Sequence, residues 1–87
     1  MPLYLVTRTL PALAPEQLEA VGKKVKNVCS EMGMEWIRSH LTADGKHSFC
    51  EFEAPNPEAC REHAARADLP IDDVIPIGME IGPGMFK

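Results

Sequence analysis

The sequence predicts an α+β fold of the ferredoxin-like class, β-α-β-β-α-β, with an antiparallel sheet and two helices on one face. Three observations support this prediction: four short segments typical of strands, two helical segments that begin with proline, and an Asp-Gly pair between the middle strands. A length of 87 residues suits one small domain. We expect this single domain to span residues 1–82, with residues 83–87 as a C-terminal tail.

The N-terminal part of the chain predicts a strand and a long helix. Residues 4–9 (YLVTRT) are rich in β-branched and aromatic residues, which favour a strand. Pro15 suits the first position of a helix, and Glu16 suits the positive end of its dipole. Gly33 is the expected stop. Between them runs an apolar stripe at intervals of three and four, typical of an amphipathic helix: Leu18, Val21, Val25, Val28, Cys29 and Met32.

The middle of the chain predicts a hairpin. Residues 35–41 (EWIRSHL) and 47–53 (HSFCEFE) have strand composition. Asp44-Gly45 predicts a type I′ turn, in which both central residues have positive φ. Such a turn pairs Ala43 with Lys46 and fixes the register of both strands.

The C-terminal part predicts a helix followed by an edge strand. In the motif APNPEA, Asn56 is the expected N-cap and Pro57 the first helical residue. The helix is expected to run to about Ala67. The last strand covers residues 74–81, and because it contains proline and glycine we expect it at an edge of the sheet.

The predicted register divides the hairpin between two faces of the sheet. The face without helices, called the open face below, is expected to pair His40 with Phe49, Arg38 with Glu51, and Trp36 with Glu53. Tyr4, Val6 and Arg8 of the first strand are candidates to join this face. The helix-covered face is expected to hold Ile37, Ser39, Leu41, Ser48, Cys50 and Phe52.

The open face favours a homodimer. It combines two large aromatic side chains with arginine, histidine and carboxylates, and exposed apolar patches commonly mark interfaces. Two such sheets packed face to face would form a dimeric α/β barrel around a polar-lined cavity. The alternative is a monomer with an exposed Arg38–Glu51 pair, which contributes only about 0.2–1 kcal/mol.

Composition argues against several other partners. The net charge is −4 and no basic stripe is present, which argues against nucleic acid. No segment approaches the roughly 20 apolar residues of a membrane span, so we expect a cytoplasmic protein. Three cysteines without a C-x-x-C motif match neither a disulfide framework nor a zinc ribbon.

Two groups of residues are candidates for a site. Cys50, Cys60 and His63 are expected to meet beneath the sheet, where thiolate and imidazole would suit Zn, Ni or Cu. The same residue types are common in protein cores, and a Cys–His nucleophile would lack an orienting group, so core packing is the favoured interpretation. The other group lies at the surface. His40 and His47 lie on either side of the hairpin turn, and Glu51 and Glu53 are on the same face of the sheet as His40.

The chain resembles a family of small bacterial proteins of similar length. The motifs that support the resemblance are W-x-R-S, F-C-x-x-E-A-P and R-x-H-A-x-x-A-x-x-P, which occur here between Trp36 and Pro70. The opening PLYLVTRTLP is similar to the family's first strand. A characterised relative is described as a nickel-binding, ferredoxin-like homodimer that holds nickel ions at its surface.

This resemblance implies a homodimer that binds Ni²⁺ or another divalent transition metal, for metal sequestration or homeostasis. Histidine nitrogens would be the main ligands. The metal would be released as the pH falls below about 6, because protonated imidazole cannot bind a metal. The expected ligands are His40, His47 and His63, followed by Cys50 and Glu51.

Two alternatives remain open. One is a small-molecule binder or a cofactor-free isomerase, cyclase or oxygenase that uses the barrel cavity, with Trp36 stacking on the ligand, Arg38 holding an anionic group, and His40 or Glu51 as acid or base. The expected cavity lining is Tyr4, Trp36, Arg38, His40, Glu51 and Glu53. The other alternative is a structural or regulatory dimer without a ligand.

Overall fold

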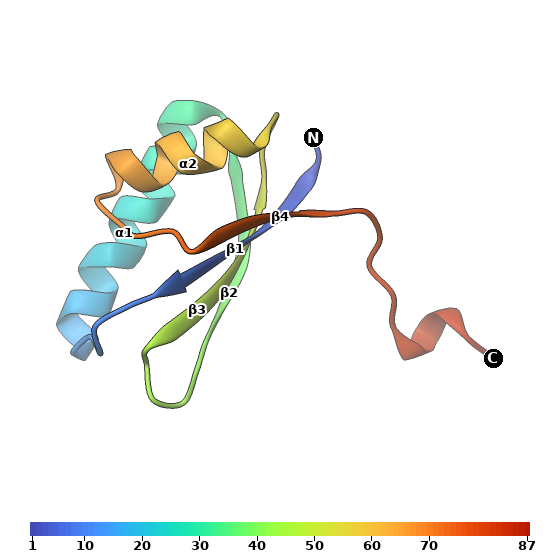
Figure 1. Cartoon of the computed structure of the whole chain (residues 1–87), viewed down its shortest axis with the longest axis horizontal. Helices are drawn as coiled ribbons and strands as arrows, with labels where there is room; N and C mark the ends of the chain where they lie inside the picture. Colours follow the sequence, from blue (N-terminus) through green and yellow to red (C-terminus); the bar gives the residue numbers. More distant parts are fainter.

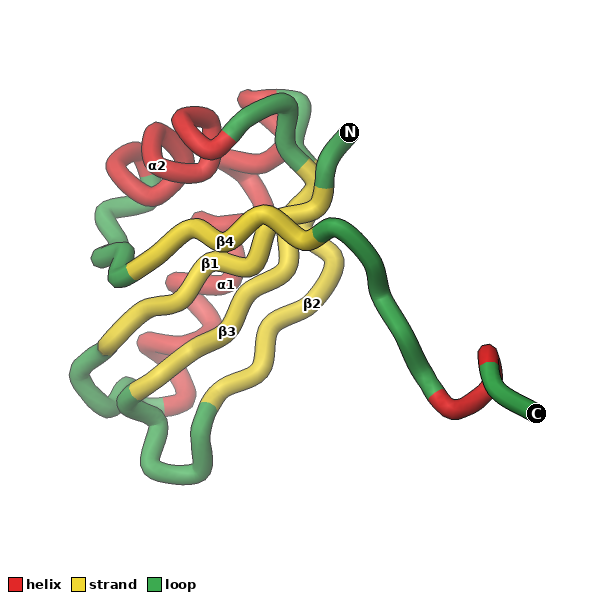
Figure 2. Tube along the Cα trace, turned by 45° about the vertical axis from the view of Figure 1, so that its right-hand side comes forward, coloured by secondary structure: helices red, strands yellow, loops and turns green.

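The computed structural model describes residues 1–87 and has the predicted α+β fold (Figure 1). The four strands form one antiparallel sheet in the order β2-β3-β1-β4, and both helices lie on one face of it (Figure 2). No helix has the length and apolar character needed to cross a membrane. In chain order the elements are β1 (Leu3–Thr9), α1 (Pro15–Met32), β2 (Glu35–Leu41), β3 (His47–Glu53), α2 (Pro57–Arg66), β4 (Asp73–Ile77) and the short 3-10 helix η1 (Pro83–Met85).

Both helices begin and end as their local sequence predicts. Pro15 starts α1, and Gly33 ends it with a left-handed φ of 66° and a hydrogen bond from its N–H to the Cys29 carbonyl. Asn56 caps α2, because its side-chain oxygen accepts a 2.8 Å hydrogen bond from the Ala59 N–H. The predicted stripe of α1 is buried only in its second half, at Val25, Val28 and Cys29.

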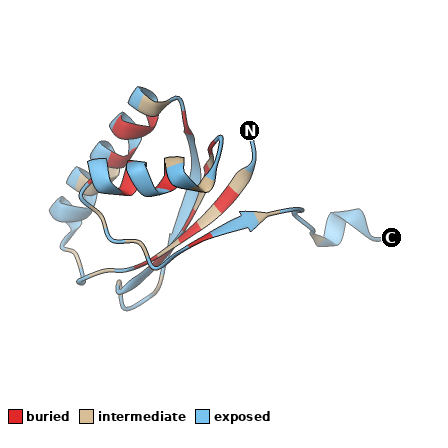
Figure 3. Ribbon diagram, turned by 45° about the horizontal axis from the view of Figure 1, so that its top comes forward, coloured by how far each residue is buried: buried red, intermediate tan, exposed pale blue.

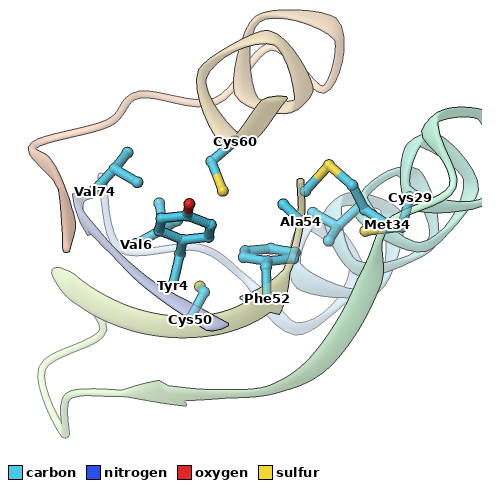
Figure 4. Packing of buried hydrophobic residues seen from close by; sticks show 10 residues of the cluster. Tyr4, Val6, Cys29, Met34, Cys50, Phe52, Ala54, Cys60 and Val74 are labelled. Atoms are coloured by element: carbon cyan, nitrogen blue, oxygen red, sulfur yellow. The ribbon is translucent and has the colours of Figure 1, made fainter. Parts of the chain in front are cut away.

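The hydrophobic core lies between the two helices and the covered face of the sheet (Figures 3 and 4). Phe52, His63, Val6 and Cys60 are its largest fully buried side chains. Burial of this apolar surface is the main stabilising contribution to the fold. The core cluster comprises Tyr4, Val6, Val25, Cys29, Met34, Cys50, Phe52, Ala54, Cys60 and Val74.

The hairpin has the predicted register but a different turn. His40 pairs with Phe49 and Arg38 with Glu51, as expected. The predicted type I′ turn is wrong, because Gly45 has positive φ and Asp44 does not. Instead, the Asp44 carboxylate accepts hydrogen bonds from the Thr42 hydroxyl at 2.7 Å and the Lys46 N–H at 2.9 Å. These bonds lower the pKa of Asp44 and hold a longer loop that keeps the same register.

A β-bulge in β2 changes the position of Trp36. The register shifts between Trp36 and Arg38, so Trp36 lies opposite Phe52 and Glu35 lies opposite Glu53. The predicted pairing of Trp36 with Glu53 is therefore wrong. The extra residue of the bulge is Ile37. Because one residue is inserted, the residues of β2 before the bulge change face, and Ile37 is exposed rather than covered.

Three residues of β1 that were expected on the open face instead face the helices. Tyr4 pairs with Phe52, Val6 with Cys50, and Arg8 with Ser48. Tyr4, Val6 and Arg8 are buried, and Tyr4 projects toward Cys60 of α2 (Figure 4). Their expected placement on the open face is wrong, because β1 is a central strand whose apolar alternation matches the core.

The last strand is at the sheet edge, as predicted, but it is shorter. It pairs only with β1 and ends at Ile77, so residues 78–81 do not extend it. The chain then leaves the body of the fold, and residues 78–87 project from it (Figures 1 and 2). We call this segment the C-terminal arm. Its exposed apolar side chains are Met79, Ile81, Met85 and Phe86.

Candidate functional site

The open face has a polar half and an apolar half. The polar half lies on β2 and β3, where Arg38 pairs with Glu51 and His40 with Phe49. The apolar half lies on β1 and β4, where Leu3 pairs with Ile77 and Leu5 with Ile75. In the register, Glu51 pairs with Leu5 and Glu53 with Leu3, so the two halves form one continuous surface.

Glu51 is the centre of the polar half. Its Oε2 lies 3.4 Å from Arg38 Nη1 and 4.0 Å from His40 Nε2. The Glu51 side chain is 14% exposed, whereas that of His40 is 71% exposed. The carboxylate is therefore held in place while the imidazole is free to change rotamer. A histidine nitrogen and a carboxylate oxygen are suitable donors for a divalent transition metal.

His47 belongs to a separate group. Its Nδ1 lies 3.5 Å from Thr9 Oγ1, and this hydroxyl donates a 2.6 Å hydrogen bond to Asp72 Oδ2. Asp72 was not among the residues predicted from sequence. No sequence signal links these three residues, because they come from β1, β3 and the loop before β4.

His63 is a core residue rather than a surface ligand. It is 1% exposed, and its Nε2 lies 3.1 Å from the Val25 carbonyl oxygen and 3.3 Å from Cys29 Sγ. Because a carbonyl only accepts, Nε2 carries the ring hydrogen and donates it. Burial lowers the pKa of His63, which favours the neutral ring. Its ring centroid lies 5.1 Å from that of Phe52.

The buried thiols near His63 stay protonated. Burial, with a smaller contribution from Cys60, raises the pKa of Cys29 to about 11. Burial also raises the pKa of Cys60. A neutral thiol beside a neutral imidazole is neither an activated nucleophile nor a thiolate ligand. The Cys50 thiol, also buried, contacts Ser48 Oγ at 3.8 Å.

The donor groups fit a metal only in part. No group of three or more His, Cys, Asp or Glu side chains lies close enough to hold an ion. Of the residues predicted as ligands, the structure brings His40 and Glu51 together, places His47 beside Thr9, and buries His63 and Cys50 in the core. A transition-metal site usually has four or more ligands, so one chain supplies an incomplete set.

The residues predicted to line an open-face cavity are divided between the two faces. Arg38, His40, Glu51 and Glu53 lie on the open face. Tyr4 and Trp36 lie on the covered face, where both pair with Phe52 of β3, Tyr4 from β1 and Trp36 from β2. Trp36 Nε1 donates a 2.8 Å hydrogen bond to Ser39 Oγ.

Comparisons with known proteins agree with this fold. A family model described as "Nickel responsive protein SCO4226-like" matches residues 4–77. The crystal structure of SCO4226 from Streptomyces coelicolor A3(2) superimposes with a TM-score of 0.80 at 14% identity, covering 91% of this chain and 99% of that one. The comparison with curated proteins gave no significant match.

Proposed function

The chain belongs to the SCO4226-like family of nickel responsive proteins, and we propose that it binds nickel, or another divalent transition metal, on the open face of its sheet. The proposed role is metal sequestration or homeostasis rather than catalysis. Three free, buried cysteines support a reducing compartment such as the cytoplasm.

The pair of His40 and Glu51 is the observation on which the proposal rests. Their donor atoms lie 4.0 Å apart, whereas two ligands of one ion with bonds of about 2.0–2.2 Å lie roughly 3 Å apart. The exposed His40 ring can close that gap by a small rotation. Arg38 would retain its contact with Glu51 and fix the carboxylate, as hydrogen-bonding neighbours of metal ligands commonly do.

A second copy of the chain would complete this site. Each chain offers two donors at the pair, so two chains related by a two-fold axis would offer four nitrogen and oxygen donors, enough for the square plane that nickel prefers with such ligands. The site would then form only in the homodimer. His47 and Asp72, linked through Thr9, would be a weaker surface site that needs no second copy.

The exposed apolar side chains of the open face support this homodimer. Phe49 is 39% exposed and Ile75 is 38% exposed, and Leu5 lies between their strands on β1. The C-terminal arm adds further exposed apolar residues, and its ribbon is mostly in the colour of exposed residues in Figure 3. Burying both surfaces against a second copy would remove them from water.

Calorimetric titration of nickel into untagged protein would test the proposal. His40→Ala and Glu51→Gln should each raise the Kd for nickel at least about tenfold, since each removes a ligand. His47→Ala is the matched control, because it removes an exposed imidazole outside the pair and should preserve the strong site. Nickel should also be released below about pH 6, where imidazole becomes protonated.

The same titration can contradict the proposal. Binding of equal strength by wild type and His40→Ala would exclude the His40–Glu51 pair as the site. No measurable binding by the wild type would exclude nickel binding altogether.

A further inference from the structure

A cavity lies between α1 and the covered face of the sheet, on the side opposite the open face. Its volume is about 330 Å³, and ten of its fourteen lining residues are hydrophobic. This volume lies near the lower end of ordinary small-molecule pockets, about 300–1,000 Å³. Leu18 and Leu41, which belong to the lining, are 45% and 44% exposed. The cavity therefore opens to solvent between the start of α1 and the edge strand β2.

Arg8 is the one charged residue in the cavity lining. It is 3% exposed, and its Nη1 donates a 2.8 Å hydrogen bond to the Pro70 carbonyl. No carboxylate lies within 4.0 Å of its guanidinium. Because no fully buried side-chain nitrogen lacks a partner, the guanidinium nitrogens that make no hydrogen bond within the protein retain some accessible surface. Several of the five N–H donors thus lack a protein acceptor.

The titratable neighbours of Arg8 do not neutralise its charge. The guanidinium acts on Cys60 and His63, lowering the pKa of each, but burial is the larger influence on both groups. Burial raises the pKa of the Cys60 thiol and lowers that of His63, so both side chains are neutral at neutral pH. A buried charge without a counter-charge is unfavourable, and an anion in the cavity would remove this penalty.

Ser48 offers a second donor beside Arg8. It is 5% exposed and lies directly opposite Arg8 in the register of β1 and β3. Its oxygen accepts from Cys50 Sγ, and its hydroxyl hydrogen has no acceptor within the protein. The polar end of the cavity therefore has two adjacent donors, while Trp36 and Val21 belong to its apolar wall.

We propose that this cavity binds a medium-chain monocarboxylic acid, with its carboxylate on Arg8 and Ser48 and its hydrocarbon chain against α1 and Trp36. The guanidinium fork matches a carboxylate in two parallel hydrogen bonds, and the predominantly hydrophobic lining matches an uncharged chain. This site shares no residue with the His40–Glu51 pair and does not depend on metal binding.

Trp36 provides the measurement, because it is the single tryptophan of the chain and lines the cavity. Titration with decanoate below its micelle concentration should change Trp36 fluorescence in a saturable way. Decanol, which has the same chain without the charge, should bind at least about tenfold more weakly, the loss expected for a charged hydrogen bond.

Two variants locate the ligand. Arg8→Met should raise the Kd for decanoate at least about tenfold and bring it close to that for decanol. Gly22→Leu should abolish binding, because Gly22 lines the cavity and a leucine side chain there would occupy part of it. A Cβ added at Gly22 meets no atom within 4 Å. The substitution also replaces glycine in a helix interior, so the variant is expected to fold. Lys23→Leu, one residue along on the exposed side of α1, is the matched control and should bind as wild type does.

Three results would overturn the proposal. They are equal affinity for decanoate and decanol, wild-type binding of decanoate by Gly22→Leu, and no saturable fluorescence change in the wild type.

Discussion

At the scale of single residues, the buried Cys–His group shows how identical residue types can serve packing or chemistry. The sequence places Cys50, Cys60 and His63 on inward-facing positions, and the structure buries all three. The partner of His63 was not predictable, because Cys29 and the Val25 carbonyl belong to α1, distant in sequence. Burial keeps the thiols of Cys29 and Cys60 and the ring of His63 neutral, which explains why these three side chains suit the core.

The buried His63 predicts a loss of stability in mild acid. In the unfolded chain this histidine protonates near pH 6.5, whereas burial lowers its pKa in the folded chain. Below pH 6.5 the unfolded state therefore binds more protons, and the free energy of unfolding should fall by up to about 1.4 kcal/mol per pH unit until folded His63 protonates. Urea denaturation between pH 7.5 and 5.5 measures this slope.

Two substitutions separate His63 from the exposed histidines. His63→Gln cannot protonate but retains a donor for the Val25 carbonyl, so the acid slope should flatten. His47→Gln is the matched control, because it makes the same substitution at an exposed histidine. An unchanged slope in His63→Gln would contradict the assignment.

At the scale of elements, the sequence predicted the helix ends, which depend on interactions between residues close in the chain. Proline and Asn56 mark the helix starts and Gly33 marks the end of α1, because caps depend on a few adjacent residues. The bulge at Ile37 was not predictable, since it arises where β2 adjusts to β3 and the core, and it moved Trp36 to the other face. The predicted register is correct although the turn type is wrong, because the observed loop exceeds the predicted one by two residues, one on each strand. The same residues therefore still lie opposite each other.

Gly22, inside α1, and Gly33, at its C-terminal end, are expected to respond to substitution with opposite changes in stability. Gly33→Ala should lower the free energy of unfolding by about 1 kcal/mol, because its φ of 66° disfavours a side chain. Gly22→Ala should raise it by about 0.5–1 kcal/mol, because it lies inside α1 with open space around the added carbon. Thermal or urea denaturation of both variants at pH 7.5 gives the comparison. Effects of the same sign would contradict the described backbone at Gly33.

At the scale of the whole molecule, the fold puts two distinct surfaces on opposite sides of one sheet. The open face combines the His40–Glu51 pair with exposed apolar residues, and the covered face contains the core and the cavity beside Arg8. The sequence predicted the fold class and most of the open face of the hairpin. It could not predict the cavity, because that depends on how far the first half of α1 stands from the sheet.

The open face predicts the state of association. Sedimentation velocity should give a mass of twice 9.6 kDa for the wild type. Ile75→Glu should shift it to the monomer, because a carboxylate in an apolar contact is unfavourable. Leu18→Glu, which changes an apolar residue of α1 that is somewhat more exposed than Ile75, should leave the dimer intact. A monomeric wild type, or dissociation by both variants alike, would contradict an open-face interface.

Whether His40 and Glu51 of two copies hold one nickel ion can be read from anomalous diffraction at the nickel edge, measured on crystals of the nickel-loaded protein. An anomalous peak is expected within bonding distance, about 2.0–2.2 Å, of His40 Nε2 and Glu51 Oε2 from both copies. A nickel peak bound only at His47 and Asp72, or no ordered peak on the open face, would contradict this arrangement.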